Sequence, residues 1–205
     1  VDGGKTWASI NFPTTPQPYQ RIVRSTQDTK GNLYVAGQGI GVAKSEDDGN
    51  TWKLLPAVFQ PNTGFPYDPY GGESVDVVIS HLIALKSDAM VAVVVFYKPG
   101  NWYTNIYKSI NGGLTWSKLF THDGNGMRAM VEADNGDLVF SDDTNDIFTF
   151  SNGALTNTFR VNGLSSPRPL MKARDGTLYF VTIVEKKNSS TMNVLYTSSD
   201  NGVSL

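Results

Sequence analysis

Cysteine is absent from the 205-residue chain, which excludes disulfides, thiolate metal sites and a cysteine nucleophile. Charge is also scarce: 18% of residues are charged, against roughly 25% in ordinary soluble domains. The 17 basic and 19 acidic residues leave a net charge of −2, so no basic surface for nucleic acid is expected. No apolar run approaches the ~18 residues of a membrane span, and the run at 90–97 is only strand-sized.

Helix signals are missing as well, because no segment combines a helical period with caps. Glycine and proline, by contrast, number 20 and 10, which predicts many tight turns. The chain begins at Val1 with neither methionine nor a signal peptide, which indicates a processed, trimmed or partial sequence.

An eight-residue pattern, Ser-x-Asp-x-Gly-x-Thr-Trp, recurs along the chain and is called the box below. It is complete at 45–52, and the copy at 109–116 carries Asn in place of Asp. The chain opens inside a copy at 1–7 and closes inside a copy at 198–205, and 149–156 is a degenerate copy. The repeat therefore organises the whole sequence. Its aligned glycines are Gly4, Gly49, Gly113, Gly153 and Gly202.

A second pattern runs in phase with the box: an Asp-Gly turn followed by alternating aliphatic and aromatic residues. It occurs at 28–35, 134–140 and 175–180, with a weakened form at 87–91. Such a pattern is a β-hairpin signal, because glycine supplies the positive φ of a tight turn. The two patterns together predict units at approximately 11–55, 56–120, 121–159 and 160–205, with 1–10 completing a sheet.

Period-two alternation predicts four short strands in each unit. The first strands are expected at 20–26, 81–87, 127–133 and 169–174, and the second at 33–37, 90–97, 138–141 and 178–184. The third are expected at 41–45, 105–109, 147–150 and 193–198, and the fourth at 51–55, 115–120, 155–159 and 203–205, with 6–10 as the fourth strand of a preceding unit.

The box resembles the Asp-box, or bacterial neuraminidase repeat, of sialidase-like β-propellers, and the resemblance covers the whole chain. It implies one all-β domain over 1–205, a β-propeller of about four four-stranded antiparallel blades. Four blades form either a small closed ring or part of a larger propeller, and the cost of exposed sheet edges favours closure.

The resemblance also implies that the box is the turn between the third and fourth strands, with an architectural Asp that holds the turn closed. The residues assigned to it are Asp2, Gly4, Trp7, Ser45, Asp47, Gly49, Thr51, Trp52, Ser109, Asn111, Gly113, Trp116, Asp200 and Gly202.

Strand direction predicts that the boxes and the first-to-second turns share one face, called the turn face. The other connections lie on the opposite face, called the loop face, where 56–75 and 98–104 carry the insertions. Tyr and Trp offer flat surfaces for sugar rings or peptides, although the loops could instead pack on their own aromatics as a lid. The candidate ligand-binding residues in these loops are Tyr67, Asp68, Tyr70, Trp102 and Tyr103.

Arginines are the second candidate group. Arg21 and Arg128 align in the first and third units, and Arg168 lies one position before its equivalent in the fourth. Sialidases bind the substrate carboxylate with three arginines, so the resemblance makes these residues candidate ligands of an acidic sugar. Leu82 stands in the second unit, and the segment 19–23 lacks the proline of the sialidase Phe-Arg-Ile-Pro signature. Ion pairing is the alternative role.

Catalytic groups are less clear. The expected loop-face acids are Asp68, Asp142, Asp143, Asp146 and Glu185, but spacing alone cannot pair them as a glycosidase requires. His81 and His122 are the only histidines, too few for a three-histidine zinc site. No metal or cofactor is predicted.

These features predict an exported protein (secreted, periplasmic or at the cell surface) that acts as a non-catalytic recognition propeller. Its ligand would be a glycan or a protein bound by the aromatic loops. The alternatives are a sialidase-like glycoside hydrolase acting on acidic sugars, or a fragment of one, and a protein-assembly-factor propeller. No nucleic-acid partner and no membrane span are expected.

Overall fold

The computed structural model describes residues 5–7, 9, 12, 21–38, 41–56, 76–98, 101–122, 126–142, 146–160, 165–185 and 191–204. These residues form strands and turns, and none of them lies in a helix. The described part of the chain therefore contains no helix that could cross a membrane. The prediction of an all-β fold is confirmed.

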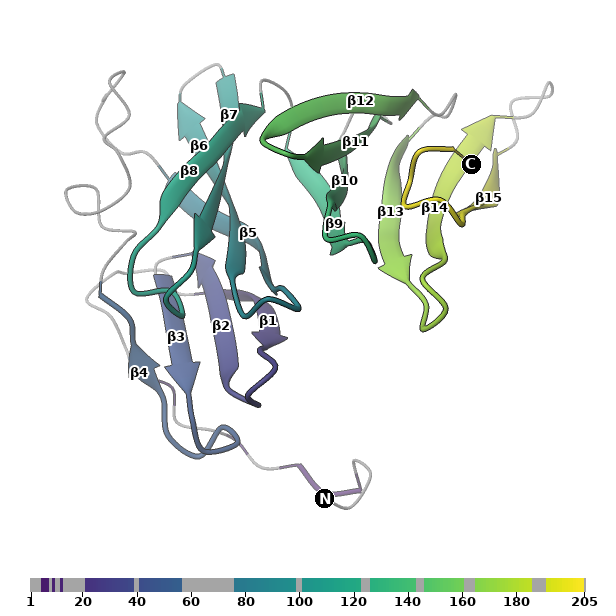
Figure 1. Cartoon of the computed structure of the whole chain (residues 1–205). Coiled ribbons are helices and arrows are strands. Elements are labelled where there is room, and N and C mark those ends of the chain that lie inside the picture. Colours follow the sequence, from purple (N-terminus) through teal and green to yellow (C-terminus); the bar gives the residue numbers. More distant parts are fainter. Residues whose placement is uncertain are drawn as a thin grey trace.

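The strands form four antiparallel sheets in which each strand pairs with the next one along the chain (Figure 1). The first sheet contains β1 (Arg21–Gln27), β2 (Leu33–Gln38), β3 (Gly41–Ser45) and β4 (Lys53–Leu54). The second contains β5 (Asp76–Ala84), β6 (Met90–Lys98), β7 (Asn101–Ser109) and β8 (Ser117–His122). The third contains β9 (Met127–Glu132), β10 (Leu138–Asp142), β11 (Asp146–Ser151) and β12 (Ala154–Arg160), and the fourth contains β13 (Ser165–Lys172), β14 (Leu178–Glu185) and β15 (Thr191–Ser198).

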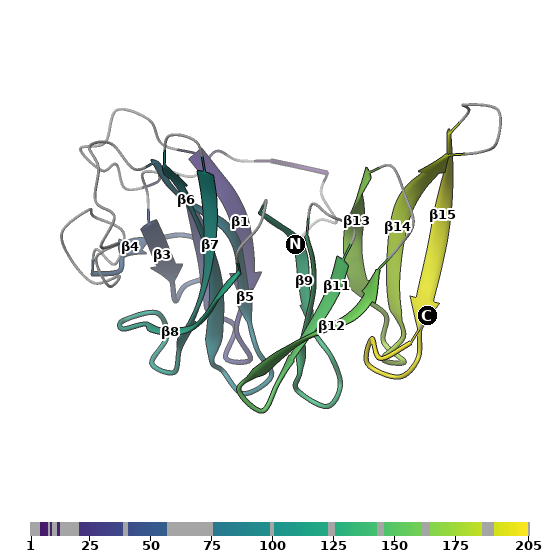
Figure 2. The same ribbon diagram turned by 90° about the horizontal axis from the view of Figure 1, so that it is seen from above.

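Neighbouring sheets pack through their first two strands. Strands β1 and β2 contact β5, β5 contacts β9, and β9 and β10 contact β13. The sheets fan out with the first and fourth at opposite ends, which is the arrangement of a β-propeller (Figures 1 and 2). The described residues form an open arc. They do not form the closed four-bladed ring that the cost of exposed sheet edges led us to expect. The rotation between neighbouring sheets, set by their packed side chains, leaves an open arc after four steps.

Several predicted strand boundaries were wrong. Strand β5 begins at Asp76 rather than at 81, because β6 is long enough to pair with all of it, from Asp76↔Tyr97 to Ala84↔Met90. Strand β13 begins at Ser165 rather than at 169, and β4 is only two residues long. In the described residues the fourth sheet has three strands, since residues 203 and 204 are not in a strand and neither are 6, 7 and 9.

The complete box forms a turn between β3 and β4 that is closed by the Asp47 carboxylate. Its Oδ1 accepts hydrogen bonds from the Thr51 amide at 2.8 Å and the Ser45 hydroxyl at 2.8 Å. The Ser45 hydroxyl in turn accepts from the Gly49 amide at 2.8 Å, and the Trp52 indole donates to the Gly49 carbonyl at 3.0 Å. The hydrogen bonds from Thr51 lower the pKa of Asp47.

The same network recurs in two other boxes. Asn111 Oδ1 accepts from the Thr115 amide at 2.9 Å, and the Trp116 indole donates to the Gly113 carbonyl at 3.0 Å. Asp200 Oδ1 accepts from the Ser204 amide at 2.9 Å. The degenerate copy differs, because Ser151 pairs directly with Ala154 and leaves a two-residue Asn-Gly hairpin with positive φ. In the first copy Trp7 is 90% exposed, and Asp2 and Gly4 lie outside the described residues.

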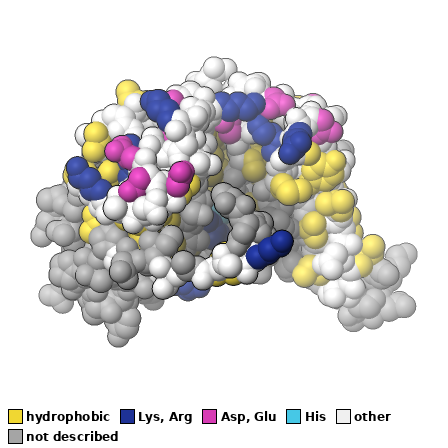
Figure 3. All heavy atoms as spheres, turned by 90° about the horizontal axis from the view of Figure 1, so that it is seen from below, with side chains coloured by type: hydrophobic (Ala, Val, Ile, Leu, Met, Phe, Trp, Pro, Cys, Tyr) yellow, Lys and Arg dark blue, Asp and Glu magenta, His cyan; other side chains and the backbone are white. Residues whose placement is uncertain are grey.

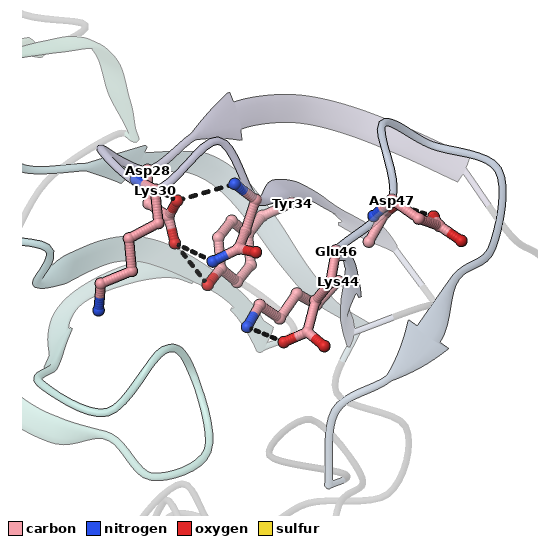
Figure 4. Close-up of polar contacts among 8 residues, drawn as sticks. Asp28, Lys30, Tyr34, Lys44, Glu46 and Asp47 are labelled. Carbon is pink, nitrogen blue, oxygen red and sulfur yellow. Dashed lines mark hydrogen bonds and ion pairs between the residues drawn. The ribbon is translucent and has the colours of Figure 1, made fainter.

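The β1–β2 turn is closed by a carboxylate of its own. Asp28 accepts hydrogen bonds from the amides of Lys30 and Asn32, from the Asn32 side chain and from the Tyr34 hydroxyl (Figure 4). Burial acts to raise the pKa of Asp28, but these hydrogen bonds outweigh it and the net shift is downward.

Three apolar clusters fill the spaces between the four sheets. Each combines second- and third-strand residues of one sheet with first- and second-strand residues of the next, as strand alternation requires. Their central members are Tyr34, Val42, Leu82 and Met90 between the first two sheets; Val91, Ile106, Met130 and Phe140 between the second and third; and Val139, Ile147, Leu178 and Phe180 between the last two.

Candidate functional site

The turns and boxes lie together on one face. Thr29 of the β1–β2 turn contacts Asp88 of the β5–β6 turn, and the Asp134 amide of the β9–β10 turn donates to Asn201 of the last box at 3.2 Å. Figure 2 shows the turns β5–β6, β9–β10 and β13–β14 pointing the same way. The ends of β6, β8, β10 and β12 therefore lie on the opposite, loop face.

The β6–β7 hairpin carries two predicted ligand-binding residues to the loop face. Both strands have nine residues, and the ladder continues to Lys98↔Asn101. Trp102 lies opposite Tyr97, and Tyr103 lies opposite Phe96. The prediction of a loop over 98–104 was wrong for 101–104, because β7 keeps pairing with β6 to the tip. Tyr67, Asp68 and Tyr70 lie outside the described residues.

The arginine alignment was wrong in register. Each of the first three sheets has an irregularity in its first strand at the same point of the ladder, where Val23, Ser80 and Arg128 are the extra residues. Such a bulge shifts every residue beyond it by one. Arg128 therefore corresponds to Val23 and not to Arg21, which is exposed at the start of β1.

The ladders instead place Arg24, His81 and Arg168 at one level. They pair with Ala36, Val93 and Val181, each of which is the fourth residue of its strand β2, β6 or β14. Arg24 Nη2 lies 3.4 Å from His81 Nε2, across the boundary between the first two sheets. His81 lies within β5, so its predicted place at the start of a strand was wrong. Sequence reasoning missed Arg24, because no local signal reveals a bulge.

A polar cluster occupies the loop-face ends of β8, β10, β11 and β12. His122 Nε2 lies 3.2 Å from Asp142 Oδ2, and the His122 ring packs against Phe148 with centroids 4.9 Å apart. Asp142 Oδ1 accepts from the Asp146 amide at 3.1 Å. Arg160 donates to both oxygens of Asp146, at 2.8 and 2.9 Å.

Two of the predicted loop-face acids are therefore bound within the fold. Asp142 and Asp146 are 2% and 5% exposed, and each has a basic partner. Because these carboxyl groups are buried and already bound to His122 and Arg160, they are withdrawn from a ligand on the surface. Asp68 and Asp143 lie outside the described residues, and Glu185 is the last residue of β14.

The turn face carries an open hollow of about 530 Å³, where the four first strands converge. Its floor is apolar, with Ile83, Met130 and Leu170. At its rim Lys86 and Lys172 donate to the same oxygen of Asp134, at 2.8 and 3.1 Å, and these hydrogen bonds lower the pKa of Asp134. Figure 3, seen from the open side of the arc, shows charged side chains gathered along one edge. No pattern in the sequence pointed to this hollow.

Four meander sheets stacked through their first strands define a β-propeller. No protein-family model matches the chain, and no curated protein is similar to it. The chain is similar to several solved structures. A protein of unknown function from Dyadobacter fermentans DSM 18053 has a TM-score of 0.61 at 16% identity, over 98% of this chain and 68% of that one.

Two other solved structures share the fold. The Hadza microbial sialidase Hz136 has a TM-score of 0.58 at 15% identity, over 88% of this chain and 43% of that one. YCF48 bound to D1 peptide has a TM-score of 0.53 at 16% identity, over 98% of this chain and 62% of that one. At such identities the likeness shows the propeller fold alone.

Proposed function

We propose that this chain is a non-catalytic recognition propeller of the Asp-box type, exported from the cytoplasm, that binds a glycan or a protein on its loop face. The observation that carries the proposal is the β6–β7 hairpin. Its ladder places Phe96, Tyr97, Trp102 and Tyr103 in two adjacent cross-strand pairs at the tip. Aromatic residues paired across the end of a hairpin suit stacking on sugar rings or on an extended peptide.

The state of the described acids supports a binding role over hydrolysis. A glycosidase needs two carboxyl groups that face the substrate. Asp142 and Asp146 are buried and hydrogen-bonded to His122 and Arg160. Similar folds occur in a sialidase and in a protein bound to a peptide, so both ligand classes are compatible with this architecture.

The test is a double substitution at the hairpin tip, Trp102→Ala with Tyr103→Ala. Binding is measured on a glycan array and by pull-down of protein partners. We expect at least about a tenfold loss of affinity, the effect of removing an aromatic hot spot. The matched control is Trp7→Ala, since Trp7 is 90% exposed and lies in the first box copy.

Thermal unfolding separates binding from packing. The double variant should keep its Tm within about 2 °C, whereas aromatics that pack as a lid would lower it by more. Unchanged binding, or a large fall in Tm, contradicts the proposal. The sialidase-like alternative requires turnover of a fluorogenic sialoside by the unmodified chain.

A further inference from the structure

The fourth sheet leaves an apolar face uncovered at the end of the arc. This end face consists of Met171, Tyr179, Val181, Ile183 and Leu195, which alternate with the residues that pack against the third sheet. Met171 is 57%, Ile183 37% and Leu195 61% exposed. Figure 3 shows hydrophobic side chains gathered over β13–β15. An apolar patch of this kind on a sheet signals a missing contact.

Ladder register shows what the contact is. Val42, Ile106, Ile147 and Leu195 hold the same position in the four sheets, because each pairs with the fourth residue of its second strand. The first three are 2%, 0% and 2% exposed, each covered by the next sheet along the chain. Only Leu195, among these equivalent residues, has no sheet beside it in the described part of the chain.

Residues of the second strands show the same difference between covered and uncovered positions. Val91 and Val139 are fully buried under the following sheet, and Tyr179 holds the equivalent position on the end face. The side chains that cover Val139 and Ile147 are Leu170, Leu178 and Phe180 of the fourth sheet. The end face is thus the outward half of an interface that the fold has already made three times.

We propose that the end face binds one further β-sheet of the same repeat, stacked as the fourth sheet stacks on the third. The bound sheet presents apolar side chains where Leu170, Leu178 and Phe180 stand in the fourth sheet. Apolar burial over a repeated geometry drives the association.

The first test uses the chain as it is and compares Leu195→Lys with Ile147→Lys. Leu195→Lys should change Tm by less than about 2 °C and should reduce the fluorescence of a dye that binds apolar surface. Ile147→Lys, at the equivalent buried position, should lower Tm by about 10 °C or more, because it buries an unpaired charge. Equal losses of Tm would mean that the end face is already packed, and would overturn the proposal.

The second test supplies the sheet. In an extended chain, residues 1–202 are followed directly by a second copy of 154–204, which adds a fourth strand to the fourth sheet and one complete set of β13–β15. We expect Tm to rise by about 5 °C or more, with dye binding unchanged because the added copy exposes an end face of its own. Leu195→Lys in the first copy should abolish this rise in Tm.

Two results of the second test would overturn the proposal. In the first, the amides of the added sheet exchange their hydrogens without protection, and the Tm of the rest of the chain is unchanged. The other is a gain in Tm that survives Leu195→Lys. Light scattering on the unmodified chain tests the rival occupant, a second copy of the chain. A dimer that dissociates in the Leu195→Lys variant would mean that the end face binds that second copy instead.

Discussion

His122 Nε2 and Asp142 Oδ2 lie 3.2 Å apart and join two different sheets, β8 of the second and β10 of the third. Both side chains are buried, at 6% and 2% exposure. The pair connects neighbouring blades through a polar contact at the loop-face end of the apolar cluster between them. Its removal is therefore expected to weaken the contact between these two sheets.

We predict that His122→Ala lowers the free energy of unfolding by about 2–4 kcal/mol, because it leaves Asp142 buried without this partner and removes a ring that packs on Phe148. Urea unfolding measures the change. The matched control is Thr121→Ala on the same strand, whose exposed hydroxyl should contribute less than about 1 kcal/mol. Equal effects of the two substitutions would contradict the assigned role of the pair.

The box predicts a sharp difference between two substitutions of one residue. Asp47→Asn should be tolerated, because Asn111 makes the equivalent contacts, accepting from the Thr115 amide and donating to the Thr115 hydroxyl. Asp47→Ala should lower Tm by about 5 °C, since it leaves the Thr51 amide and the Ser45 hydroxyl without their acceptor. Thermal unfolding of the two variants measures the difference. An unchanged Tm for Asp47→Ala would show that the turn closes without its carboxylate.

Acid should destabilise the fold through the turn carboxylates. Hydrogen bonds from Thr51 lower the pKa of Asp47, and hydrogen bonds from Ser204 lower the pKa of Asp200, both from an ordinary value of 3.8. A carboxyl whose pKa is lower in the folded state stabilises it above pH 3.8, and this stability is lost as pH falls through the folded-state pKa.

The urea midpoint should therefore fall as the pH is lowered below about 4, and the double variant Asp47→Asn with Asp200→Asn should show a smaller fall because neither position can titrate. Equal pH dependence of the double variant and the unmodified chain would show that other groups carry the acid sensitivity.

Substitution by alanine should lower the free energy of unfolding by different amounts at two turn glycines. Gly113 has φ +84°, and an added Cβ would lie 2.7 Å from the Leu55 methyl group, whereas Gly136 has φ +86° and no atom within 4 Å of that position. Gly136→Ala should cost about 1 kcal/mol from backbone strain alone, and Gly113→Ala about 2–4 kcal/mol because the Leu55 contact adds to it. Similar losses of unfolding free energy in the two variants would mean that the side chains around Leu55 rearrange at little energetic cost.

The turns could be predicted from sequence because their chemistry is local. Ser45, Asp47, Gly49 and Thr51 make their hydrogen bonds to one another within a few residues of chain. The second strands were placed well for the same reason, since Leu33, Met90, Leu138 and Leu178 each follow a turn signal directly. The first strands were placed less well, because β5 is as long as its partner β6 and not as long as its own pattern suggests.

The candidate site was only partly predictable. Trp102 and Tyr103 were assigned to the loop face correctly by strand direction, but their place in a paired hairpin depends on β6. Arg24 was missed and Arg21 misaligned, because the extra residues Val23 and Arg128 shift the ladder without any mark in the sequence.

By itself, the sequence determined the repeat, the hairpin turns, the all-β class and the two faces, since each follows from hydrogen bonds and alternation over a few consecutive residues. The tertiary structure alone decided that His122 meets Asp142, that Arg24 meets His81, and that Leu195 is exposed where Ile147 is buried. These relationships depend on how one sheet rotates against the next. That rotation is set by packing between residues far apart in the chain, and no local pattern encodes it.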